Sequence, residues 1–113
     1  MNISRFKEII KEREKISKET QDNWDYGIEK CWTELIQLVS DNIDESINFI
    51  LNDCTKEEFS WLSEVIEDII ENTKSKNLLE AYKSVANKYA DESKKYHVFE
   101  KIQDAESLLE EDK

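Results

Sequence analysis

Residues 53–73 read DCTKEEFSWLSEVIEDIIENT and carry the clearest helix signals in the chain. Thr55 and Glu58 match the capping box, in which the Thr hydroxyl accepts the backbone N–H three residues on and the Glu carboxylate accepts the N–H of the Thr. Apolar residues then recur at the spacing of one helical face. They are Phe59, Leu62, Ile66, Ile69 and Ile70. We therefore expect one helix that begins near residue 56 and continues to a polar break at residues 72–76.

The same stretch carries a row of acids, here called the acid ridge. The ridge consists of Glu57, Glu64, Asp68 and Glu71. These residues stand at i, i+7, i+11 and i+14, so one continuous helix would place them on a single face. Trp61 lies on the flank of the apolar stripe. The ridge predicts a surface that binds a partner. The alternative is an ordinary solvated helix face without a binding role.

The composition indicates an all-α protein. Of the 113 residues, 38% are charged and 38% are hydrophobic, with no proline and a single glycine, Gly27. Amphipathic helices reconcile these fractions, because each helix contributes only one stripe to the core. A sheet protein of this size would need more turn-forming residues. The length is that of one domain, so we expect a single helical domain over residues 1–113.

Working outward from residues 53–73, the apolar periodicity predicts about six helices. They cover about residues 2–19, 24–39, 43–51, 56–71, 76–89 and 94–109. Short connections make neighbouring helices antiparallel and pair them as three hairpins. The hairpins could form a short HEAT-like stack or an irregular bundle. In a stack, the second, fourth and sixth helices would line one face that carries the acid ridge, and the acidic tail Glu110–Lys113 is expected to fray.

The charge limits the possible partners. The net charge of −11 disfavours direct binding to nucleic acids and to anionic membranes, and it favours a basic protein partner. Residues 2–19 alone carry six basic and four acidic residues, and this interleaving favours a salt-bridged helix face over a membrane-binding one. The sequence shows no apolar run long enough to span a bilayer and no secretory leader, so we expect a cytoplasmic protein.

Catalytic and metal-binding patterns are missing from the sequence. His97 is the only histidine, and there is neither an HExxH nor a glycine-rich phosphate loop. Cys31 and Cys54 have no metal-ligand spacing and are expected to be buried free thiols. We therefore expect no enzyme activity, no cofactor and no metal ion. Exposed aromatic residues could instead anchor a partner, and the candidates are Trp24, Tyr26, Trp61 and Tyr96.

One part of the chain resembles a known family. Five segments carry the resemblance: Phe49–Thr55, Glu58–Phe59, Trp61–Val65, Asp68–Ile69 and Thr73–Lys76. This pattern, within about residues 47–92, resembles small all-helical immunity proteins of bacterial contact-dependent growth inhibition and related polymorphic toxin systems. Ala90 departs from the family, whose members often have proline after the preceding Lys-Tyr.

The resemblance implies a protein without catalytic activity that binds one cognate toxin domain in the cytosol. The toxin would be a nuclease, expected to cleave RNA, and the immunity protein would block its basic active-site cleft. In that role Glu57, Glu64, Asp68 and Glu71 would supply charge and Trp61 would be the anchor. The alternative is an acidic helical scaffold or adaptor without a toxin partner.

Overall fold

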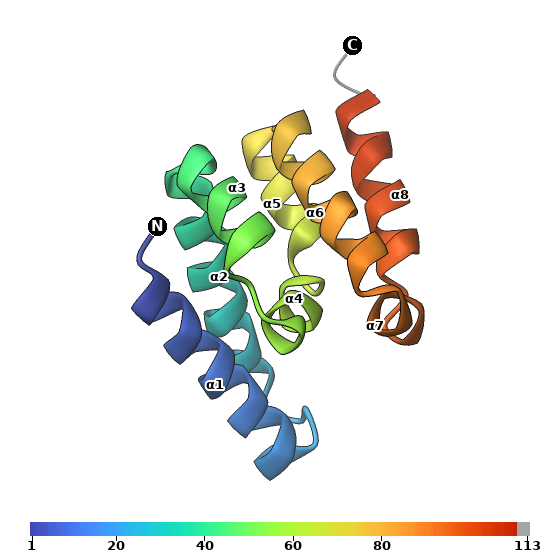
Figure 1. The fold of residues 1–113 in the computed structure, drawn as a ribbon. Coiled ribbons are helices and arrows are strands. Elements are labelled where there is room, and N and C mark those ends of the chain that lie inside the picture. Colours follow the sequence, from blue (N-terminus) through green and yellow to red (C-terminus); the bar gives the residue numbers. More distant parts are fainter. Residues whose placement is uncertain (111–113) are drawn as a thin grey trace.

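The computed structural model describes residues 1–110, which form eight α-helices (Figure 1). Within that range no residue lies in a strand, which confirms the all-α expectation. The helices are α1 (Ile3–Thr20), α2 (Asp25–Asp41), α3 (Ile43–Asn52), α4 (Lys56–Leu62), α5 (Ile66–Thr73), α6 (Lys76–Lys88), α7 (Ala90–Lys95) and α8 (Val98–Glu110). Glu110 of the predicted tail ends α8, and residues 111–113 lie outside the described residues.

The first two helices form a hairpin at the N-terminal end of the molecule. The side chain of Asn2 caps α1 by accepting the backbone N–H of Arg5 at 3.1 Å. The chain then reverses through Gln21 and Asp22, whose φ angles of 53° and 64° are left-handed. The polar break predicted at residues 19–23 is therefore a tight turn, and α1 and α2 lie side by side (Figure 1).

The helix expected over residues 56–71 is two helices, α4 and α5. Its start is as predicted, because the Thr55 hydroxyl accepts the N–H of Glu58 at 3.1 Å and the Glu58 carboxylate accepts the N–H of Thr55 at 2.9 Å. The chain then turns at residues 63–65 through backbone bonds to the third residue back, from Glu64 to Trp61 and from Val65 to Leu62. The turn buries Val65 completely, and it separates Glu57 and Glu64 from Asp68 and Glu71, with which they would share a face in a continuous helix.

A second difference lies in the connection before the last helix. The predicted connection at residues 90–93 is helical and forms α7. His97 follows with a left-handed φ of 58°, which separates α7 from α8. These two breaks explain why the described chain has eight helices where the periodicity predicts six.

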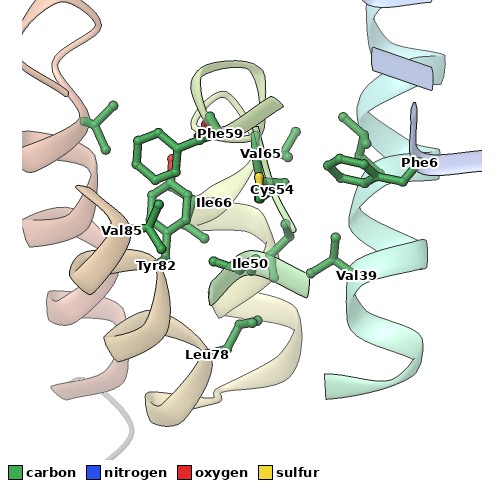
Figure 2. Packing of buried hydrophobic residues seen from close by; sticks show 14 of the residues in the cluster. Phe6, Val39, Ile50, Cys54, Phe59, Val65, Ile66, Leu78, Tyr82 and Val85 are labelled. Atoms are coloured by element: carbon green, nitrogen blue, oxygen red, sulfur yellow. Dashed lines mark hydrogen bonds between the residues drawn. The ribbon is translucent and has the colours of Figure 1, made fainter. Parts of the chain in front are cut away.

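One apolar core joins residues from most of the helices (Figure 2). Phe59 of α4 stacks on Tyr82 of α6 with ring centroids 4.5 Å apart, and the Tyr82 hydroxyl donates to the Phe59 carbonyl oxygen at 3.3 Å. Cys31 and Cys54 are buried free thiols, as expected. Burial raises the pKa of Cys54 to about 12, so this thiol is held protonated.

The order of helix packing sets the surfaces that remain exposed. α2 packs on α5, and α5 packs on α8. On the other side of the core α3 packs on α6, and α6 also contacts α8 (Figure 1). No helix in the described part of the chain is both long and apolar enough to cross a membrane.

Candidate protein-binding surface

The predicted site residues lie in two separate places. Glu57, Trp61 and Glu64 line a hollow of about 550 Å³ between α1, α4, α7 and α8, here called the α1–α4 hollow. Asp68 and Glu71 line a second hollow of about 510 Å³ between α2 and α5, here called the α2–α5 hollow. The break at residues 63–65 causes this separation, so the acid ridge is not one continuous face.

Glu64 belongs to an internal ion-pair network. The Arg13 guanidinium donates to both Glu64 oxygens, from Nε at 2.8 Å and from Nη2 at 2.9 Å, and its Nη1 donates to Asp22 at 2.8 Å. Trp32 adds a bond from its Nε1 to Glu64 Oε1 at 3.2 Å. Because Arg13 is only 4% exposed, it needs this balancing charge. The Glu64 carboxylate is therefore committed to Arg13.

Trp61 is also held from within the molecule. The Arg13 guanidinium lies 4.8 Å from the centre of the Trp61 ring, a favourable cation–π distance. On its polar edge the indole Nε1 donates to Glu14 at 3.1 Å. The sequence signal for this arrangement is Arg13 itself, a cation on the apolar stripe of the first helix, although its partners cannot be read from spacing.

The remaining charges of the α1–α4 hollow also balance. Lys56 bonds to Glu92 at 3.1 Å, which raises the pKa of the Lys56 ammonium. Lys101 contributes another cation to the lining. Glu57 is exposed at this hollow, beside the Lys56–Glu92 pair. The hollow thus brings together three predicted residues in a nearly neutral setting.

The α2–α5 hollow is different, because its charged lining residues are all acids. The hollow is lined by Thr33, Ile36, Gln37, Ser40, Asp41, Asp68, Glu71 and Asn72. Asp41, Asp68 and Glu71 are exposed, and none forms an ion pair with another described residue. The hydroxyl oxygen of Ser40 is buried without a hydrogen-bond partner in the same lining. The three exposed carboxylates can therefore accept hydrogen bonds from cationic groups of a partner.

The acidity extends from this hollow toward α8. Burial raises the pKa of Glu67, and the nearby carboxylates of Asp104 and Asp68 raise it further, while Lys101 lowers it. Such a shift marks acids that crowd one another. Glu67, Asp68 and Asp104 thus extend the acidic surface from the α2–α5 hollow to the contact of α5 with α8.

Asp41 is a site residue that the sequence pattern did not single out. It lies in the short gap between the helices predicted over residues 24–39 and 43–51. Asn42 is the residue that caps α3, accepting the N–H of Glu45 at 3.1 Å, whereas Asp41 ends α2 and faces the hollow. Thr33, Gln37 and Asp41 follow one another at intervals of four residues, and this spacing is the signal that could have identified Asp41.

Metal ligation has no support among the described residues, where no three His, Cys, Asp or Glu side chains lie so that they could hold a metal ion. In comparisons with known proteins, no family model, curated protein or solved structure matches the chain.

Proposed function

We propose that this protein is an immunity protein that binds and neutralises a basic toxin domain, a nuclease expected to cleave RNA. The observation that carries this proposal is the α2–α5 hollow, where Asp41, Asp68 and Glu71 face one space without any cation in the lining. A nuclease must present cationic groups to phosphate, and the same groups are complementary to clustered carboxylates. Bound in that cleft, the protein would exclude RNA without any chemistry of its own.

The proposal includes a HEAT-like stack of three successive helix pairs, α1–α2, α3–α5 and α6–α8, of which the first and the last pack directly helix on helix. Support comes from the packing of α2 on α5 and of α5 on α8, with α3 on α6 behind them. The short helices α4 and α7 would then be inserts at the ends of the hairpins. In this arrangement one row of helices presents the acidic face, and the protein would act in the cytoplasm, where its toxin reaches RNA.

The roles of the predicted residues follow from their surroundings. Asp68 and Glu71, joined by Asp41, would make the main charge contacts. Glu57 and Trp61 would lie at the edge of the interface. Glu64 would contribute indirectly, because its carboxylate already pairs with Arg13.

The direct test is binding to the basic C-terminal domain of a toxin encoded immediately before this gene. The variant is Asp41→Lys/Glu71→Lys, because both positions lie in the last turn of a helix, where a cation is favoured by the helix dipole. The matched control is Glu19→Lys/Glu80→Lys, which changes net charge equally at exposed positions outside the hollow.

We expect the α2–α5 variant to bind at least about 100-fold more weakly at low salt, since close charge pairs at protein interfaces contribute about 1.5 kcal/mol or more each. Its affinity should also depend less on salt, whereas the control should retain tight binding. A folded Asp41→Lys/Glu71→Lys protein that neutralises the toxin with unchanged salt dependence would refute the proposed surface. Failure of the wild-type protein to bind the toxin would favour the scaffold alternative.

A further inference from the structure

One exposed stripe runs along the whole of α2. Its members are Tyr26, Glu29, Thr33, Gln37 and Asp41, spaced by three or four residues, and all are exposed. Residues at this spacing share a helix face. The stripe covers about 22 Å at the rise of an α-helix, and its last members, Thr33, Gln37 and Asp41, line the α2–α5 hollow. The other end of the stripe is therefore continuous with the acidic surface.

At that other end lies a pair of exposed aromatic side chains. Trp24 is 51% exposed and Tyr26 is 70% exposed, and their ring centroids lie 6.2 Å apart. No hydrogen bond within the described residues ties either ring to the rest of the protein. Large aromatic side chains that are exposed next to one another are the residue types that dominate protein–protein interfaces.

Gly27 holds the indole of Trp24 in place. A Cβ atom added at Gly27 would lie 2.3 Å from a carbon of the Trp24 ring, so the indole rests directly against the backbone of α2. Gly27 is helical and has no positive φ, so its backbone conformation does not require glycine. Glycine lowers helix stability relative to alanine, and the close approach of the indole is what the missing side chain permits.

We propose that the Trp24–Tyr26 pair is the apolar anchor of the surface that binds the basic partner, which rests on the function proposed above. The partner would cover the α2 stripe, with its cationic cleft at the α2–α5 hollow and an apolar recess about 20 Å away. Acidic residues surround the anchor, so the rim of that recess is expected to be basic. These residues are Asp25 and Glu29, which line a smaller hollow of about 290 Å³ together with Arg13 and its partner Asp22.

The anchor and the acids can be separated by their salt dependence, with the toxin domain named above as the probe. We expect Trp24→Ala/Tyr26→Ala to weaken binding about 100-fold, because hot-spot aromatics each contribute a factor of ten or more. The salt dependence of binding should remain that of the wild type. The control is Leu51→Ala, which removes an exposed apolar side chain of α3 that lines none of the three hollows and should leave the affinity unchanged.

Gly27→Ala tests the positioning of the indole without removing it. The added methyl group should displace the exposed indole and weaken binding about tenfold, while the free energy of unfolding stays equal or rises because alanine favours the helix. Wild-type affinity in Trp24→Ala/Tyr26→Ala would overturn the anchor and leave the acidic site standing. Loss of affinity in that variant only to the extent seen in Leu51→Ala would overturn it as well, and a wild-type protein that does not bind the toxin would overturn both proposals.

Discussion

Arg13 shows how one residue can organise several segments of this small protein. Its guanidinium is buried under Trp61 and bonds to Glu64 and Asp22, so it joins α1, the turn after α1 and the break between α4 and α5. We predict that Arg13→Met lowers the free energy of unfolding by about 3 kcal/mol, because it leaves a partly buried carboxylate without its cation. Chemical denaturation measures this difference.

The double variant Arg13→Met/Glu64→Gln should recover part of that loss, since the amide carries no charge and still accepts from Trp32. Lys11→Met, an exposed change on the same helix, serves as control and should stay within about 0.5 kcal/mol of wild type. Equal stability of Arg13→Met and Lys11→Met would show that the network contributes nothing to folding.

Among the helices, α4 depends most on its cap, because it is only seven residues long and short helices are marginal without tertiary support. The Glu58 carboxylate of the capping box also bonds to Lys7 of α1 at 2.7 Å. We predict that Thr55→Ala lowers the free energy of unfolding by about 1 kcal/mol, whereas Thr55→Ser, which keeps the hydroxyl, changes it little. Urea denaturation of both variants makes the comparison, and identical midpoints for the two would contradict a stabilising cap.

The same elements show how far the sequence predicts the fold and the site. Local signals, such as the Thr55–Glu58 box and the apolar periodicity, correctly place α1, α2, α3 and α6 to within about two residues, together with the start of α4. The break at residues 63–65 was not predictable, because the pairing of Glu64 with Arg13 joins residues 51 positions apart. The prediction of the acid ridge assumes one continuous helix through residues 63–65. Because the helix is broken there, Asp68 and Glu71 lie together at one hollow, while Glu57 and Glu64 lie at the other.

Across the whole molecule, the cations of α1 neutralise acids of neighbouring helices. Arg5 bonds to Glu34 of α2 at 2.6 Å, and Lys7 and Arg13 bond to Glu58 and Glu64. Within α1, Arg5 also pairs with Glu8 and Glu12, so part of the salt-bridged face expected for residues 2–19 is present, and the other pairs join α1 to its neighbours. With 27 acidic and 16 basic residues in the chain, the acids outnumber the cations, and Asp41, Asp68 and Glu71 at the α2–α5 hollow are among the acids that form no ion pair with a described residue.

Glu67 lies on α5 at the contact between α5 and α8, among other acidic residues. Its pKa is raised by burial and by Asp104 and Asp68, so the ionised carboxylate destabilises the folded state at pH values above its folded pKa. We predict that Glu67→Gln stabilises the protein at pH 8 by about 0.5 kcal/mol, the size of a like-charge pair on a helix surface. This advantage should shrink as the pH falls through the folded pKa of Glu67 and vanish below its unfolded value, because both side chains are then neutral. Denaturation at several pH values, with the exposed Glu80→Gln on α6 as control, measures the difference, and a Glu67→Gln protein less stable than wild type at pH 8 would contradict crowding of acids at this contact.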